Sequence, residues 1–321
     1  MEKAAKKIIV LIGPTASGKS SLALKVAGEF CGEIVSCDSM QIYKNMDIGT
    51  AKPNNEEKER IPHHMIDICS CKDNYSAGDY AKDASAAIDD IISRGKTPIV
   101  CGGTGMYLDT LLRPVAFSYE QDEGKSLKIR EDYKRFYEEN GAEALHKKLE
   151  EVDPESAREI HPNNVKRVIR ALEIYCLTGV KKSEHDKNSL SGESPYLPFF
   201  INLMYENRET LYKRIDDRVD TMMANGLEEE VRGLVQSGEL VKDSTAAQAI
   251  GYREFFDYFE GKLSLEETVS LIKKDSRNYA KRQLTWFRKY TPYTSVNDGN
   301  TSETIFASVK DEIKSFIETT M

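Results

Sequence analysis

The stretch GPTASGKS at residues 13–20 constrains the fold more than any other part of the chain. It matches the pattern G-x-x-x-x-G-K-[ST] at every position and follows a short apolar run at residues 8–12. In this pattern, glycines let backbone N–H groups surround a phosphate, Lys19 supplies a positive charge, and the Ser20 hydroxyl can ligate Mg²⁺. Such a loop lies between a strand and the N-terminus of a helix. The motif therefore predicts a strand, a phosphate-binding loop and a helix, but leaves the reaction open.

Short apolar runs alternate with helical patterns through the first third of the chain. We expect strands at residues 7–12, 33–37, 65–68 and 98–101. Strands that alternate with helices indicate βαβ units. The predicted fold class is therefore α/β, a P-loop NTPase-like core with a mostly parallel sheet.

The pattern changes to helical segments without strands between residues 117 and 198. The end of this region, 181–198, is polar and rich in Ser, Gly and Pro, so we expect a loop there. Strand character returns at 199–205. We therefore predict a first part of the core at 1–116, an inserted all-helical domain at 117–198, and a second part of the core with C-terminal basic helices at 199–321.

The composition excludes several classes of protein. No apolar run is long enough to cross a bilayer, so we expect no membrane partner. The six cysteines form no CxxC pair, which favours reduced thiols in a cytoplasmic protein over a zinc site or a disulfide framework. A monomer is the default expectation.

The position of the acidic residues separates possible activities. A kinase or ATPase needs an acid at the end of a later apolar strand to hold Mg²⁺, but residues 98–101 are followed by Gly102, Gly103 and Thr104. Asp38 instead follows the second predicted strand, at the sheet edge where open α/β sheets bind ligands. A strand-end aspartate is more commonly a helix cap. Both interpretations of Asp38 stay open at this point.

A basic and aromatic segment lies near the C-terminus, although the net charge of the chain is −8. Residues 270–290 contain seven Lys or Arg residues against Asp275 alone, a local charge of +6, together with Tyr279, Trp286, Phe287 and Tyr290. This mixture suits a nucleic-acid backbone flanked by bases, and it equally suits a solvated helix face.

Eight motifs in order closely resemble the tRNA dimethylallyltransferase family. They are GPTASGKS, DSMQIYKNMDIGTAKP, HHMID, GGTGMYLDTLL, RALEIY with TG, RVDTMMANGLEEEV, AIGYREF and YAKRQLTWFRKY, between residues 8 and 290. The resemblance implies transfer of the dimethylallyl group from dimethylallyl diphosphate to N6 of the adenosine immediately 3′ of the anticodon, position 37, with release of diphosphate. It also implies Mg²⁺ as cofactor, with the tRNA anticodon stem-loop as partner.

The resemblance further implies roles for individual residues. The general base is Asp38, the leaving diphosphate meets Arg218 (Arg208 is the second choice), Ser20 binds Mg²⁺, and Thr104 completes the catalytic group on the adenine side. The implied diphosphate ligands are Gly13, Pro14, Thr15, Ala16, Ser17, Gly18, Lys19 and Ser20. The implied tRNA contacts are Asp38, Ser39, Met40, Gln41, Thr104, Lys166, Arg167, Arg170, Gln248, Gly251, Tyr252, Arg253, Lys281, Arg282, Gln283, Thr285, Trp286 and Arg288.

Two alternatives compete with prenyl transfer. The first is a small-molecule kinase that uses ATP, which the phosphate loop and an inserted helical lid would suit. The second is a non-enzymatic tRNA-binding protein gated by nucleotide, which would need an RNA-binding face but would have no use for Asp38. The missing strand-end acid and the basic aromatic segment both count against the kinase.

Overall fold

The computed structural model describes residues 5–113, 123–190, 194–296 and 300–319. The chain forms two compact units. The first combines Met1–Leu112 with Pro195–Met321, and the second is Arg113–Ser194. The predicted limit between 116 and 117 falls outside the described residues. No helix in the described ranges is both long and apolar enough to cross a membrane.

A six-stranded sheet forms the centre of the first unit, and every strand pair in it is parallel. The order across the sheet is β3-β2-β4-β1-β5-β6. The strands are β1 (Lys6–Ile12), β2 (Gly32–Cys37), β3 (His63–His64), β4 (Thr97–Gly102), β5 (Tyr196–Tyr205) and β6 (Tyr293–Val296). The predicted α/β class with a mostly parallel sheet is therefore confirmed.

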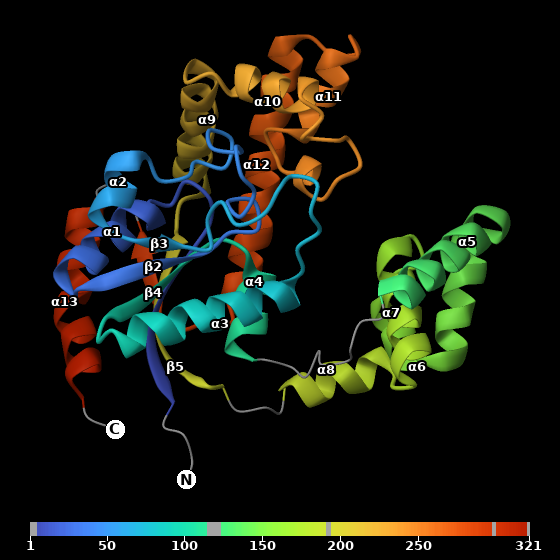
Figure 1. The fold of residues 1–321 in the computed structure, drawn as a ribbon, viewed down its shortest axis with the longest axis horizontal. Coiled ribbons are helices and arrows are strands. Elements are labelled where there is room, and N and C mark those ends of the chain that lie inside the picture. Colours follow the sequence, from blue (N-terminus) through green and yellow to red (C-terminus); the bar gives the residue numbers. More distant parts are fainter. Residues whose placement is uncertain (1–4, 114–122, 191–193, 297–299, 320–321) are drawn as a thin grey trace. The chain divides into compact units, whose positions relative to one another are not determined.

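Side chains of the central strand β1 alternate between two cores, because successive residues of a strand point to opposite faces. Ile9 and Leu11 face the core that α1 (Lys19–Glu29) and α13 (Ser302–Glu318) cover. Ile8, Val10 and Ile12 face the opposite core. The helices over this second face are α3 (Ala77–Ser93) and α4 (Gly105–Leu112). Figure 1 shows helices on both sides of the sheet.

A third core lies beyond the carboxyl ends of the strands, where Figure 1 shows α9, α10 and α11 gathered. It joins Ile42, Tyr43 and Met46 to helices from the C-terminal third of the chain. Those helices are α9 (Arg208–Ala224), α10 (Leu227–Gln236), the 3-10 turn η1 (Ala246–Gln248), α11 (Arg253–Phe259) and α12 (Leu265–Phe287). Residues of α9 and α12 also line a cavity together with Thr15 of the phosphate loop.

The second unit is all-helical in its described residues. Its helices are α5 (Glu123–Val152), α6 (Pro154–Glu159), α7 (Val165–Thr178) and α8 (Lys182–Leu190). Gly141 has φ 83° and interrupts α5. Leu145, Leu149, Val168 and Leu172 form its apolar centre.

Two local predictions are wrong. No strand forms at 65–68, because Met65 and Asp67 have φ of 63° and 57°, which breaks the extended backbone. The two-residue strand β3 lies just before them. The polar region at 181–198 also contains α8 and the beginning of β5 instead of a continuous loop. The buried Asp153 carboxylate accepts hydrogen bonds from the Ser183 backbone N–H and hydroxyl, which anchors the start of α8.

Local sequence signals fix several helix ends. Ser76 caps the start of α3 in a capping box with Asp79. After α3, Gly95 has φ 71°, which a residue without a side chain adopts readily. The short helix α2 (Asn55–Arg60) begins with a capping box of the same kind.

A buried carboxylate fastens the β2–β3 edge of the sheet and gives a prediction about stability. Glu33 accepts two hydrogen bonds from Arg94, at 2.5 and 2.7 Å, and one from His64 at 2.8 Å. The Arg94 hydrogen bonds, opposed by burial and helped by His64, lower the pKa of Glu33 from 4.5 to about 2. A carboxylate with a depressed pKa stabilises the fold above its unfolded pKa, and that contribution is lost as the pH falls from 4.5 towards about 2.

We expect Glu33→Gln to lower the free energy of unfolding at pH 7 by about 1–3 kcal/mol, because the bonds to a charged acceptor are weakened. The difference from the unmodified protein should shrink below pH 4.5, because Glu33 of the unfolded chain binds a proton there while the folded protein, with a pKa of about 2, does not. Urea unfolding at a series of pH values measures both effects. The exposed Glu59→Gln is the matched control. A difference that stays constant down to pH 2.5 would contradict this account.

Candidate active site

The glycine-rich loop has the backbone geometry of an anion site. Gly13 has φ 151°, and a Cβ there would lie 2.8 Å from the Leu203 carbonyl oxygen, so only glycine fits without rearrangement. Gly18 is the N-cap of α1 in the left-handed region, with φ 88°, and no side chain caps the helix. The first N–H groups of α1 therefore keep their capacity to bind an anion.

Lys19 is placed to meet that anion. Its Nζ donates to the Pro14 carbonyl at 2.6 Å, so the side chain lies folded over the loop. Burial is the largest cause that lowers the pKa of Lys19 to about 8, with smaller effects of Cys101, Arg218 and Asp38. Ser20 follows it in the first turn of α1 and is exposed.

Asp38 and Thr104 lie at the ends of neighbouring strands, as parallel pairing of β2 and β4 requires. Asp38 Oδ1 accepts from the Met40 N–H at 2.9 Å, so the carboxylate closes a tight turn and caps no helix. Thr104 Oγ1 accepts from the Ser39 N–H at 3.0 Å, and the Thr104 N–H donates to the Cys37 carbonyl at 3.0 Å. These bonds fix the backbone on both sides of Asp38.

Gln283, from α12, joins the two loops of the site. Its Oε1 accepts from the Thr15 N–H at 2.7 Å, and its Nε2 donates to the Gly103 carbonyl at 2.9 Å. The Tyr279 hydroxyl donates to the same Gly103 carbonyl at 3.2 Å. Gln283 is only 4% exposed and lines the hollow at the phosphate site, and its contact with RNA stays a prediction. Its position indicates a role in holding the phosphate loop.

Helix α9 supplies the arginines beside the loop. Arg218 is half-buried, and burial lowers its pKa while the nearby Asp38 opposes that shift. Arg214, one turn earlier, donates from Nε to the Ala16 carbonyl at 2.9 Å. The second choice, Arg208, is the exposed first residue of α9, almost three turns from Arg218. The structure therefore favours Arg218.

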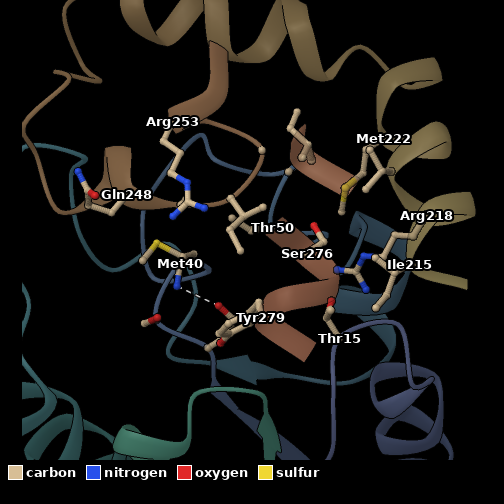
Figure 2. A pocket seen from close by; sticks show the side chains of 18 of the residues that line it. Thr15, Met40, Thr50, Ile215, Arg218, Met222, Gln248, Arg253, Ser276 and Tyr279 are labelled. Atoms are coloured by element: carbon tan, nitrogen blue, oxygen red, sulfur yellow. Dashed lines mark hydrogen bonds between the residues drawn. The ribbon is translucent and has the colours of Figure 1, made fainter. Parts of the chain in front are cut away.

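Two hollows share Asp38 and Arg218 among their lining residues. One has a volume of about 200 Å³ and an apolar side formed by α9 and α12 residues such as Ile215, Met222 and Ile272. The other, of about 90 Å³, reaches Lys19 and Ser20. Both are lined by Thr15, Asp38, Thr50, Arg218 and Tyr279. Figure 2 shows Arg218 and Arg253 pointing into the first hollow, above Thr15. A phosphate site and a partly apolar cavity therefore share one carboxylate and one arginine.

Most of the RNA contacts predicted in residues 39–41 and 248–253 line the first hollow. Ser39, Met40 and Gln248 line the first hollow, as do Gly251 and Arg253. Arg253 forms ion pairs with Glu254 at 2.8 Å and Asp275 at 2.5 Å.

Two of these predicted contacts have internal partners. Gln41 bonds to Ser36 Oγ at 2.9 Å and to the Thr50 carbonyl at 3.2 Å, so its amide holds the loop. Tyr252 is fully buried, and we no longer expect its side chain to contact RNA.

The basic segment of α12 carries less free charge than its composition indicates. Lys273 and Arg277 form ion pairs with Asp220 and Asp216 of α9, and Lys289 pairs with Asp109 of α4. The predicted RNA-contact residues that remain exposed along this segment are Lys281, Arg282, Thr285, Trp286 and Arg288.

Trp286 is held in place from two sides. Its Nε1 donates to Asp109 Oδ2 at 3.1 Å. A Cβ on Gly105 would lie 2.3 Å from the indole ring, so the ring lies directly on that glycine. Its exposed fraction is 38%, which leaves part of a fixed aromatic ring facing solvent.

The predicted RNA contacts of the second unit lie on α7. Lys166 and Arg167 are exposed in its first turn. Arg170 instead forms an ion pair with the buried Glu173 at 2.8 Å, and Glu173 also accepts from Arg130 at 2.8 Å. One basic residue of α7, Arg170, is therefore paired with a buried acid of the same helix.

No group of three or more His, Cys, Asp or Glu side chains in the described ranges could hold a metal ion. His63 and His64 form β3, and His64 bonds to Glu33. A metal at this site would therefore depend on Ser20, water and the phosphate ligand. The serine hydroxyl of a phosphate-binding loop is a known Mg²⁺ ligand beside phosphate oxygens and waters, so Ser20 fits that ion.

Several residues of the site have no predicted role. Thr50 and Glu230 lie inside two of the quoted motifs, and Arg214 lies outside all of them. Arg214 and Glu230 act through contacts with segments distant in the chain. The spacing of four between Arg214 and Arg218 was the available signal, since residues one turn apart share a helix face.

Comparison with known proteins gives consistent results. A family model described as IPP transferase matches residues 41–290. A protein named tRNA dimethylallyltransferase from Caldanaerobacter subterraneus subsp. tengcongensis is 50% identical over 285 residues, which cover 88% of this chain and 89% of that protein. A protein of the same name from Bacillus cytotoxicus is 47% identical over 315 residues, 98% of each chain.

Solved structures agree with these matches. A tRNA delta(2)-isopentenylpyrophosphate transferase from Staphylococcus epidermidis is 42% identical with a TM-score of 0.69, over 97% of this chain and 99% of that one. A eukaryotic dimethylallyltransferase acting on tRNA is 32% identical with a TM-score of 0.79, over 97% and 80%. The parallel sheet and its glycine-rich loop define a P-loop-type α/β protein. Within that class, the chain belongs to the IPP transferase family.

The low pKa of Lys19 predicts how anion binding depends on pH. A lysine with a pKa of about 8 is charged at pH 7 and largely neutral at pH 9, so affinity for inorganic diphosphate should fall as the pH rises through 8. Titration calorimetry with Mg²⁺ and diphosphate between pH 6.5 and 9 measures this. The same series with Lys19→Met removes the contribution of the ligand's own ionisation. Identical pH profiles for the two proteins would contradict the prediction.

Proposed function

We propose that this protein transfers the dimethylallyl group from dimethylallyl diphosphate to N6 of the adenosine at position 37 of tRNA, and releases diphosphate. The observation that carries the proposal is that Asp38 and Arg218 line both hollows, the one at the phosphate loop and the partly apolar one beside it. The names of the family's relatives support this reaction over the kinase and the non-enzymatic alternative.

Asp38 acts on the acceptor. An adenine exocyclic amine is a weak nucleophile, because its lone pair is delocalised into the ring. In the transfer, a bond forms between N6 and C1 of the dimethylallyl group, the C1–O bond to diphosphate breaks, and Asp38 takes the proton from N6. General-base assistance of this kind contributes about 10²–10⁴-fold. The bonds of Thr104 to Ser39 and Cys37 keep the Asp38 turn in place.

The residues at the phosphate loop act on the leaving group. Negative charge develops on the diphosphate as the C1–O bond breaks, and preorganised cations and N–H donors stabilise it. Lys19, Arg218 and the backbone of residues 13–18 are the groups at this position. Mg²⁺ bound at Ser20 would add positive charge to the diphosphate. Arg214 holds the loop through Ala16 and lines the outer side of the same phosphate site.

The acceptor base must leave its stack in the anticodon loop to reach Asp38. The exposed cations and Trp286 of α12 lie on the first unit, and Lys166 and Arg167 lie on the second. These two sets of residues are the proposed RNA contacts of each unit taken separately. Such contacts predict affinity that falls steeply with salt. A cytoplasmic location and a monomeric state belong to the same proposal, since tRNA is the large partner.

The proposed reaction can be tested directly. Purified protein is incubated with unmodified tRNA, Mg²⁺ and dimethylallyl diphosphate, and with ATP as the parallel donor. The expected result is a gain of one dimethylallyl mass on a single adenosine in the digested tRNA, only with the prenyl donor. Phosphate transfer from ATP, without a mass gain on several different tRNAs, would overturn the proposal.

We expect Asp38→Asn to lower kcat by about 10²-fold or more, because the amide cannot accept the N6 proton. The affinity for tRNA should change by less than about threefold, since the basic surface is intact. Single-turnover rates and filter binding measure the two quantities. The exposed Asp311→Asn, on α13, is the matched charge control. Equal rates for the two variants would contradict the assignment of Asp38.

A further inference from the structure

The carboxylate of Glu230 has an unusual set of partners. It lies in the first turn of α10 and accepts hydrogen bonds from three successive backbone N–H groups of another segment. These are Asp47 at 3.0 Å, Ile48 at 2.8 Å and Gly49 at 3.3 Å. No lysine or arginine among the described residues forms an ion pair with it. Glu230 is therefore balanced by peptide groups, not by a cation.

A fourth partner connects Glu230 to a second segment. The Tyr252 hydroxyl donates to Glu230 Oε1 at 2.5 Å. Tyr252 is fully buried, and burial together with Glu230 raises its pKa far above the ordinary value, so the phenol keeps its proton and acts as the donor. A Cβ on Gly49 would lie 2.4 Å from the Tyr252 ring, so the ring lies directly against that glycine.

Both connected segments line the cavity beside Asp38. Gly49 and Thr50 come from one segment, and Gln248, Ala249 and Gly251 come from the other. The two segments lie far apart in the sequence, and Glu230 bonds to both. Glu230 itself does not line the cavity. It can therefore influence the cavity only through the segments that it holds.

Neighbouring acids in the same helix have different partners. Glu228 forms an ion pair with Arg232 at 2.5 Å, which is a common pairing one turn apart. Glu229 is exposed. An acid in the first turn of a helix favours the N–H groups of its own helix. Glu230 instead bonds to N–H groups of residues 47–49, which an ordinary helix-stabilising role does not explain.

We infer that Glu230 is a positioning residue for the transfer reaction, which sets the geometry of the cavity by fixing residues 47–49 to Tyr252. The inference rests on the proposed function, in that this cavity is where the acceptor and donor meet. Reacting groups that are misplaced by about 1 Å can lose about 10²-fold in rate. Loss of Glu230 should therefore act on kcat, while the basic surface that binds tRNA stays unchanged.

The experiment compares Glu230→Gln with Glu229→Gln, the same change at the preceding, exposed position. The glutamine keeps the shape of the side chain but turns an NH₂ group towards the N–H and O–H donors. We expect kcat to fall about tenfold or more in Glu230→Gln only. The tRNA dissociation constant and the KM for dimethylallyl diphosphate should stay within about threefold. Tyr252→Phe, which breaks only one of the four bonds, should lie between the two.

Amide hydrogen exchange provides a readout that does not need activity. The N–H groups of residues 47–49 should exchange about tenfold faster or more in Glu230→Gln, with no change in Glu229→Gln. Unchanged exchange would overturn the inference, as would wild-type kcat in Glu230→Gln. An equal loss of kcat, tRNA affinity and helical circular dichroism would overturn it too, because the role would then be structural only. If the unmodified protein transfers no dimethylallyl group, the proposed function fails, and the exchange result still decides whether Glu230 holds residues 47–49.

Discussion

The site depends on a single buried amide, that of Gln283. This side chain bonds to the backbone of the phosphate loop at Thr15 and to the backbone after β4 at Gly103. Removing one partner of a buried hydrogen bond costs about 1–3 kcal/mol. The cost here would fall on two loops that carry chemistry and have few other ties to α12. A Cβ on Gly103 would lie 2.2 Å from Gln283 Nε2, so this glycine permits the close approach.

The charged groups of the site lie close to the two loops that Gln283 joins. Asp38 lies close enough to Lys19 and Arg218 to affect the pKa of each cation, in a place that is partly removed from water. Burial disfavours both cations, and Asp38 opposes that effect on each. An anionic ligand would stabilise both cations further. One carboxylate and two cations therefore lie where the proposed transfer needs a proton acceptor and positive charge.

The sequence predicted the parts of the molecule that local rules control. The glycine-rich loop requires a strand and a helix, and Asp38 follows from the rule that parallel strands present their carboxyl ends together. Periodicity did not predict β3 or α8, because a left-handed backbone at Met65 and a buried contact of Asp153 decide those segments. The hydrogen-bonding roles of Gln283 and Glu230 were not predictable for a related reason, although both residues lie in quoted motifs. Each acts through a segment about 180 residues or more away, and no spacing rule encodes such a contact.

The free charge of a segment is likewise not predictable from its composition, because ion pairs with distant segments decide it. A count of residues gave the C-terminal basic segment a charge of +6, but the acids of α9 and α4 neutralise three of its cations in the folded protein. The cations without an acidic partner among the described residues are Lys274, Lys281, Arg282 and Arg288. A phosphate backbone releases counterions only where a protein cation is free to replace them. The proposed RNA contact of this segment therefore depends mainly on Lys281, Arg282 and Arg288, which are exposed near the partly exposed ring of Trp286.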